Sequence, residues 1–94
     1  MGKRRDKIEM IHDILHICLK PSRTTYILRL GNIQYNVFKE MMPQLESMNY
    51  VEKTEVIPRR SRSRSYYLWH TTRMGSELMN EIGDLMDKTN FSGE

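Results

Sequence analysis

Residues 59–64 read Arg59-Arg60-Ser61-Arg62-Ser63-Arg64, and this run lies between two stretches with the composition of β-strands. These stretches, Tyr50–Ile57 and Tyr66–His70, are rich in β-branched and aromatic residues. The run itself holds four arginines and no acidic residue. Guanidinium groups bind phosphate in a bidentate geometry, so a basic loop at the tip of a hairpin favours a partner covered in phosphates. A charge cluster alone is usually only a solvated loop, so the segments around it decide between the two interpretations.

Two helices are predicted before the hairpin, at Thr24–Leu30 and Ile33–Met48. Gly31 separates them and is suited to the left-handed conformation that follows a helix end. Pro43 lies inside the second helix, where it removes a backbone donor and is expected to kink the helix. Two helices joined by a short glycine-containing turn form a helix-turn-helix unit.

One further helix is predicted on each side of this unit, at residues 6–19 and 72–88. The first carries two apolar stripes, where a surface helix needs only one. We therefore expect burial on two sides, one of them a subunit interface. One stripe consists of Ile8, Ile11, Leu15, Cys18 and Leu19, and the other of Met10, Ile14 and Ile17.

Three of the helix ends have candidate terminal residues. Ser22 or Thr24 is the candidate N-cap of the second helix, and Thr72 is the candidate N-cap of the last. Asn49 is suited to the position directly after the C-cap of the third helix.

The predicted elements follow the order α-α-turn-α-β-wing-β-α, which is mainly α with a small β-hairpin, an α+β arrangement. A basic hairpin directly after a helix-turn-helix makes a winged helix-turn-helix. The whole chain, residues 1–94, is expected to form this single domain. Residues 1–5 would be a basic arm, 58–65 the wing loop, 72–88 a dimerisation helix and 89–94 a frayed tail.

The charge of the chain is divided along its length. Residues 1–75 carry fourteen Lys or Arg and seven Asp or Glu, a net charge of +7, whereas residues 76–94 carry −4. This asymmetry suggests that one surface attracts a polyanion while another faces away from it. The single cysteine excludes an internal disulfide, and no apolar run is long enough to span a membrane. We expect a soluble, cytoplasmic, nucleoid-associated protein.

Four short segments, at residues 3–11, 31–35, 48–52 and 72–75, together resemble small archaeal winged-helix regulators. They read Lys3-Arg4-Arg5-Asp6-Lys7-Ile8-Glu9-Met10-Ile11, Gly31-Asn32-Ile33-Gln34-Tyr35, Met48-Asn49-Tyr50-Val51-Glu52 and Thr72-Arg73-Met74-Gly75. That group includes short chromatin-associated DNA-binding proteins that dimerise through a long C-terminal helix. The resemblance covers about residues 3–86 and implies a DNA-binding dimer whose third helix enters the major groove. The chain departs from the family at Pro43 and in its shorter last helix, which implies a more compact dimer interface.

The resemblance places the groove-facing residues on the third helix, and these are Gln34, Tyr35, Asn36 and Lys39. Asn and Gln can read adenine edges, and Lys can reach guanine or phosphate; an ordinary solvated face is the alternative. The wing is expected to contact phosphate or the minor groove through Arg59, Arg60, Arg62 and Arg64, unless it is only a solubilising loop. The DNA backbone would be contacted by Lys3, Arg4, Arg5, Arg23, Thr24 and Thr25.

The dimer is expected to form through the last helix, assisted by the second stripe of the first helix. Its predicted interface consists of Met10, Ile14, Ile17, Leu78, Met79, Ile82, Leu85 and Met86.

Other chemistry has few candidate residues. His12 and His16 are four residues apart, a spacing that metal sites use, but a structural role is the better interpretation because no further ligand is nearby. Cys18 is expected to be an inert core thiol. We find no phosphate-cradling glycine loop and no paired acid and base, so we expect no enzyme, metal, cofactor or small-molecule ligand.

The sequence therefore predicts a double-stranded DNA-binding protein that regulates transcription as a homodimer. The alternatives are a non-specific chromatin-associated DNA-binding protein and a winged-helix protein-interaction module.

Overall fold

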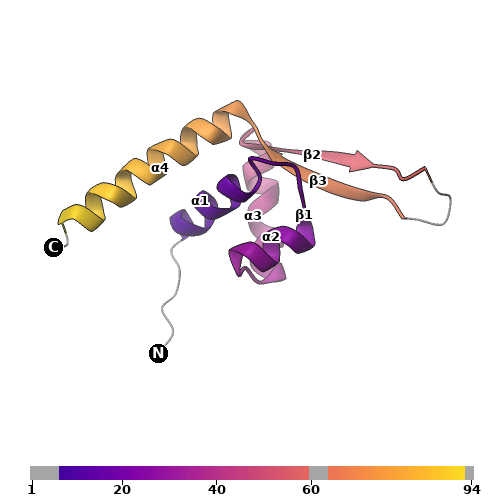
Figure 1. Cartoon of the computed structure of the whole chain (residues 1–94), viewed down its shortest axis with the longest axis horizontal. Helices are drawn as coiled ribbons and strands as arrows, with labels where there is room; N and C mark the ends of the chain where they lie inside the picture. Colours follow the sequence, from indigo (N-terminus) through magenta and orange to yellow (C-terminus); the bar gives the residue numbers. More distant parts are fainter. Residues whose placement is uncertain (1–6, 60–63, 93–94) are drawn as a thin grey trace.

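The elements of the chain follow the predicted order and form a winged helix-turn-helix (Figure 1). The computed structural model describes residues 7–59 and 64–92, with side chains as far as residue 86. The elements are α1 (Lys7–Ile17), β1 (Ser22–Arg23), α2 (Thr24–Gly31), α3 (Tyr35–Ser47), β2 (Val51–Val56), β3 (Tyr66–Thr71) and α4 (Arg73–Ser92). Helices α2 and α3 are the helix-turn-helix, and β2 and β3 are the hairpin of the wing. The arm at residues 1–5 and residues 60–63 of the wing loop lie outside the described residues.

The sheet has a third strand that the sequence did not predict. Its order is β1-β3-β2, and both pairs are antiparallel. In β1, Ser22 lies opposite Trp69 and Arg23 opposite Leu68. A strand of two residues has no periodicity to recognise, so only its pairing with β3 identifies it. Because β3 is the central strand, it joins the other strand of the wing, β2, to the segment that leads into α2.

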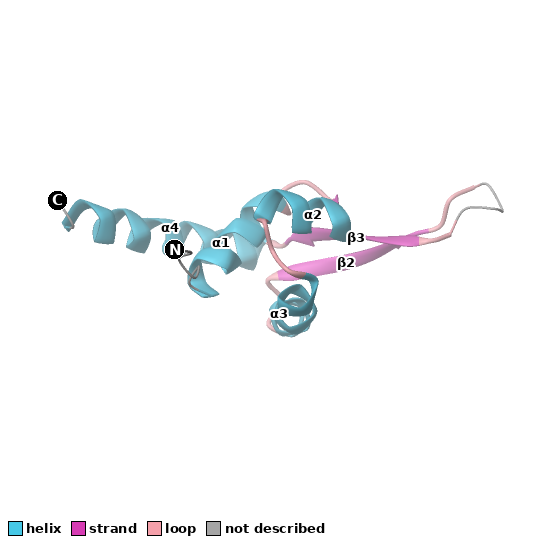
Figure 2. Ribbon diagram, turned by 90° about the horizontal axis from the view of Figure 1, so that it is seen from below, coloured by secondary structure: helices cyan, strands magenta, loops and turns pink. Residues whose placement is uncertain are grey.

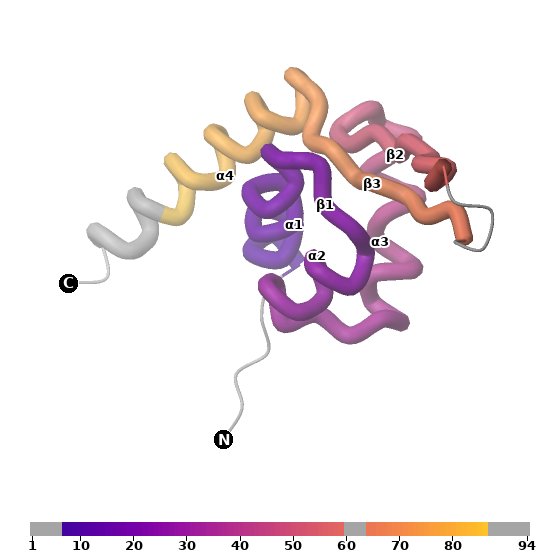
Figure 3. The backbone as a smooth tube through the Cα atoms, turned by 45° about the vertical axis from the view of Figure 1, so that its right-hand side comes forward, coloured from indigo at the N-terminus to yellow at the C-terminus, as the bar shows by residue number. Residues whose placement is uncertain are grey.

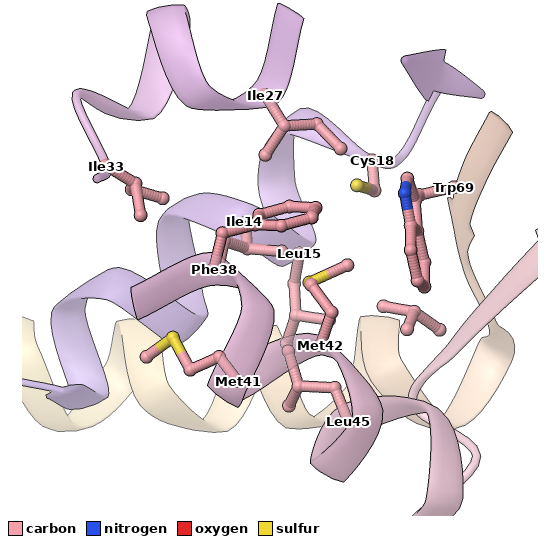
Figure 4. Packing of buried hydrophobic residues seen from close by; sticks show 11 residues of the cluster. Ile14, Leu15, Cys18, Ile27, Ile33, Phe38, Met41, Met42, Leu45 and Trp69 are labelled. Atoms are coloured by element: carbon pink, nitrogen blue, oxygen red, sulfur yellow. The ribbon is translucent and has the colours of Figure 1, made fainter. Parts of the chain in front are cut away.

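The core lies where α1, α2 and α3 meet the inner face of the sheet (Figure 4). Leu15 and Ile27 are fully buried, and the rings of Phe38 and Trp69 meet edge to face with centroids 5.9 Å apart. Edge-to-face packing aligns the positive ring edge with the negative ring face, which stabilises such pairs.

Burial in this core raises the pKa of the Cys18 thiol to about 12. This thiol therefore stays protonated at neutral pH, consistent with the inert core residue predicted.

Helix α1 occupies the centre of the domain, with α2 and α3 on one side and α4 on another (Figure 3). Its second apolar stripe packs on the helix-turn-helix of the same chain. Met10 shares a crevice with Val37 of α3, and Ile14 is fully buried in the core. This corrects the expectation that the second stripe serves a subunit interface. Ile82 of α4 is also buried, so neither Ile14 nor Ile82 is exposed to a partner.

Asparagine residues end the two helices of the helix-turn-helix. Asn32 has φ 52° and Asn49 has φ 67°, both in the left-handed region. After α2, the N–H of Ile33 donates to the carbonyl oxygen of Leu28 at 3.0 Å, which satisfies a carbonyl that the helix leaves open. Asn49 therefore occupies its predicted position. The prediction for Gly31 was wrong, because Gly31 is the last helical residue and Asn32 takes the left-handed conformation instead.

The observed N-caps of α2 and α4 agree in part with the predicted ones. Thr72 caps α4 as predicted, because its Oγ1 accepts a hydrogen bond from the N–H of Gly75 at 3.0 Å. At α2, Arg23 occupies the N-cap position without a side-chain cap. The hydroxyl of Ser22 donates instead to the carbonyl oxygen of Lys20 at 2.8 Å, closing the turn after α1.

Two helices have different bounds from those predicted. Helix α3 begins at Tyr35 rather than Ile33, and it continues past Pro43 to Ser47. Helix α4 continues to Ser92, so the segment predicted to fray after Lys88 starts within the helix. Twenty residues of α-helix are about 30 Å long, and α4 runs along α1 and then beyond it (Figure 1).

Gly75 lets α4 approach the connection between α3 and β2 closely. A Cβ atom there would clash with the carbonyl oxygen of Tyr50, whereas a Cβ at Gly83 would meet only the Nε2 of His12 at 3.6 Å. We expect Gly75→Ala to lower the free energy of unfolding by about 1–3 kcal/mol, because the backbone of Tyr50 must move. Gly83→Ala is the matched control and should raise it by up to about 1 kcal/mol through helix propensity.

Urea unfolding followed by the fluorescence of Trp69, the one tryptophan of the chain, measures both changes. Equal stability of the two variants would contradict the close approach at Gly75.

Candidate nucleic-acid interface

The exposed face of α3 carries the residues that were predicted to read bases. Burial of the opposite face, through Phe38, Met41, Met42 and Leu45, orients this face outward. Tyr35, Asn36 and Lys39 are all exposed, and the Lys39 ammonium lies 5.6 Å from the centre of the Tyr35 ring. Gln34 is exposed as well, but it precedes the helix as an extended residue. The structure thus brings the four predicted residues together at the start of α3.

Helix α3 carries two exposed acidic residues, Glu40 and Glu46. Glu40 and Gln44 line a crevice together with Lys7 and Met10 of α1. Both of these α3 residues therefore lie on the edge of the helix that faces α1. Because Glu40 is exposed and four residues after Asn36, its carboxylate borders the face formed by Tyr35, Asn36 and Lys39, and this face is polar.

Lys53 adds a cation between α3 and the wing that sequence reasoning missed. It shares the inner face of β2 with the buried Val51, and Trp69 lies opposite it on β3. Its ammonium lies 4.7 Å from the centre of the Tyr67 ring and 5.4 Å from that of Trp69. A cation over an aromatic face is held by the ring quadrupole. The alternation of side chains along β2 from Val51 was the signal in the sequence that could have found Lys53.

The wing projects from the body on the side opposite the free end of α4 (Figure 2). Arg59 and Arg64 flank its loop, and both are exposed. The other two predicted wing residues, Arg60 and Arg62, lie outside the described residues, as do Lys3, Arg4 and Arg5 of the arm. The two described arginines place positive charge at the far end of the hairpin from α3.

The start of α2 carries the other predicted backbone contacts. The indole N–H of Trp69 donates to Oγ1 of Thr24 at 3.1 Å, which leaves the hydroxyl hydrogen of Thr24 to donate elsewhere. Arg23 and Thr25 are exposed. The guanidinium of Arg23 stacks on the ring of Tyr66, 3.6 Å from its centre, so its position is set by β3.

These groups suit recognition of a polyanion with readable polar edges. Amide and ammonium groups on α3 can hydrogen-bond to base edges, while the cations of β1, β2 and the wing can bind phosphate. The described residues contain no cluster of three or more metal-ligating side chains. Within the same residues, no helix combines the length and the apolar character needed to cross a membrane.

Comparisons with known proteins agree with this architecture. A family model described as winged helix-turn-helix matches residues 4–90. The chain is similar to Sso10a-2, a DNA-binding protein from Sulfolobus solfataricus, with a TM-score of 0.76, 19% identity, and coverage of 95% of this chain and 87% of that one. A search of curated protein sequences gives no significant match.

Two further solved structures are similar to this chain. A PadR-like transcription factor from Bacteroides fragilis has a TM-score of 0.71 and 12% identity, over 92% of this chain and 88% of that one. ZitR from Lactococcus lactis, in complex with DNA, has a TM-score of 0.63 and 13% identity, over 97% of this chain and 60% of that one. Identities this low show a shared fold.

Proposed function

Because the chain belongs to the winged helix-turn-helix family, we propose that it binds double-stranded DNA and regulates transcription as a homodimer. The observation that carries this proposal is the exposed face of α3, where Tyr35, Asn36 and Lys39 lie together. Helix α3 enters the major groove, where base edges present a distinct pattern of donors and acceptors for each base pair. Asn36 is suited to adenine, and Lys39 to guanine or phosphate.

The DNA backbone is contacted from two sides of α3. On one side, Arg23, Thr24 and Thr25 surround the start of α2, where the unpaired N–H groups of a helix favour phosphate. On the other side, Lys53 and the arginines of the wing supply cations along the hairpin. Phosphate contacts of this kind set the position of the protein on the duplex and supply most of its salt-dependent affinity.

The dimer forms through the exposed part of α4 in this proposal. Leu85 is 61% exposed and Met74 is 47% exposed, while Leu78, Met79 and Met86 are half-buried. Helix α4 extends beyond α1, so a second copy can pack against it (Figure 1). Large exposed apolar side chains on one helix face favour an interface. A two-fold arrangement would place two α3 helices about 34 Å apart, one turn of DNA.

The acidic residues of α4 support this orientation. Glu77, Glu81 and Asp84 are exposed on α4. With α4 at the dimer axis and α3 on the DNA, these carboxylates lie away from phosphate, in keeping with the charge division of the chain.

Replacement of Asn36 by alanine tests base reading. We expect Asn36→Ala to weaken binding to the preferred site by about 1–3 kcal/mol and to change binding to random duplex little, because only the preferred site presents the matching base edge. Gln44→Ala, an exposed amide on the α1-facing edge of α3, is the control and should change neither. Fluorescence anisotropy with the preferred genomic fragment and with random duplex measures both. Equal losses on the two duplexes would instead indicate a general DNA coat.

Removal of the wing charge tests the backbone contacts. Replacing Arg59, Arg60, Arg62 and Arg64 by serine should weaken binding to every duplex. Each lost phosphate contact should flatten the slope of log affinity against log salt by about 0.9. Arg73→Ser removes an exposed cation at the start of α4 and should leave the slope unchanged. A wing variant with an unaltered salt slope would show that the loop does not contact DNA.

Leu85 provides a test of the dimer that Ile82 cannot provide, because Ile82 is buried in the core. Leu85→Glu should give a folded monomer, since the side chain is exposed in the single chain and charged groups disfavour apolar interfaces. Asn80→Glu adds the same charge at another exposed position of α4 and should leave the dimer intact. Sedimentation equilibrium at micromolar concentration distinguishes the two. A wild-type protein that is monomeric both free and on DNA would refute the dimer.

A further inference from the structure

A groove of about 780 Å³ opens where α1 ends and α2 begins, beside the proposed DNA-binding surface. It is bounded by the last turn of α1, the connection through Pro21, β1, the outer face of α2 and Leu68 of β3. Pockets of about 300–1,000 Å³ are typical of small-molecule sites, which are mostly apolar with a few converging polar groups. Its size therefore suits a small molecule.

The walls of this groove are apolar side chains with large exposed areas. Leu19 is 42% exposed, Tyr26 is 49% exposed and Leu30 is 56% exposed. Tyr26 and Leu30 are four residues apart and so share one face of α2. Exposed apolar side chains that gather in one concave place are typical of a binding surface.

The polar groups of the groove carry positive charge. Lys20, Arg23 and Arg29 line it, together with His16, and no acidic side chain is among its lining residues within the described part of the chain. These three cations repel one another around the apolar groove, and a bound anion would offset this repulsion. This combination selects for an anionic head group as well as an apolar body.

We propose that this groove binds a small amphipathic anion, an apolar molecule with a single carboxylate or phosphate group. Leu19, Tyr26 and Leu30 contact its apolar part, and Lys20 and Arg29 bind its head group. An inorganic anion would leave the apolar walls in water, and an amine would meet like charges, so neither satisfies both features of the groove.

Ligand and DNA compete in this arrangement, a consequence that rests on the proposed function. Arg23 and Thr25 line the groove and are also proposed phosphate contacts. Arg23 further stacks on Tyr66, the first residue of the strand that returns from the wing. A bound anion that attracts Arg23 therefore withdraws a cation from DNA. By thermodynamic linkage, DNA weakens the ligand by the same factor.

Calorimetric titration of the full chain without DNA tests the site directly. Decanoate and decyl phosphate are the two amphipathic anions, and decylammonium and inorganic phosphate are the controls for charge and for the apolar chain. We expect both decyl anions to bind once per chain, and at least about tenfold more tightly than either control. A preference for decanoate would assign the head group to a carboxylate, and a preference for decyl phosphate to a phosphate ester.

Two substitutions locate the binding. Arg29→Gln and Leu30→Ser should each weaken decanoate about tenfold, because one removes a charge-assisted contact and the other removes apolar area. Arg73→Gln and Ile57→Ser remove an exposed cation and an exposed apolar side chain that do not line the groove, and they should leave the affinity unchanged. Decanoate affinity that is unaffected by Arg29→Gln and Leu30→Ser would overturn the site. So would tight binding of inorganic phosphate, which would show an anion patch without an apolar requirement.

Dissociation of a dimer by Arg29→Gln and Leu30→Ser, without any decanoate binding by the wild type, would show that a second copy occupies the groove. That result would also overturn the proposal.

The competition between ligand and DNA is measured last, as release of labelled duplex by decanoate. Failure to bind duplex at all would refute the proposed function while leaving the decanoate titration intact. Binding of both without competition would refute only the coupling through Arg23.

Discussion

The indole of Trp69 sets the relative positions of α2, α3 and the hairpin. A buried indole needs a partner for its N–H, and Thr24 at the first turn of α2 supplies the acceptor at 3.1 Å. The Phe38 ring from α3 meets the same indole in a T-shaped contact, and the Lys53 ammonium lies over it from β2. One side chain of the central strand thus holds both helices of the helix-turn-helix and the base of the wing, so the proposed interface depends on it.

Hydrogen bonds of Thr71 and Thr72, which follow Trp69 along the chain, set the positions of α1 and α4. The hydroxyl of Thr71 donates to the carbonyl oxygen of Leu15 at 2.7 Å, and its backbone N–H donates to that of Cys18 at 2.8 Å. Leu15 lies in the last turn of α1 and Cys18 directly follows it, where an α-helix leaves its acceptors unpaired. Thr72 then caps α4. Because one strand satisfies the end of α1 and starts α4, the position of α4 follows from that of the wing.

Helix α2 separates two surfaces with different chemistry. Its start, with Thr24 and Thr25, belongs to the polar surface proposed for phosphate, whereas Tyr26 and Leu30 contribute apolar walls to the groove on its outer side. Arg23 lies between the two, on the ring of Tyr66. A short helix with one buried face can serve both surfaces, because its two exposed edges point in different directions. Regulation by a ligand would then require no movement of α3.

The sequence by itself determined the order of the elements, the hairpin and its basic loop, the exposed set on α3, the cap at Thr72 and the turn at Asn49. These features depend on periodicity and turn chemistry within a few residues, so they can be read locally. Only the tertiary structure decided the pairing of β1, the packing of the second stripe of α1 inside its own chain, the place of Lys53 and the groove beside α2. Each of these depends on contacts between distant segments; Thr24 and Trp69, for example, are separated by 45 residues. An apolar stripe predicts that one side of a helix will be buried, but the fold of the whole chain decides which segment covers that side.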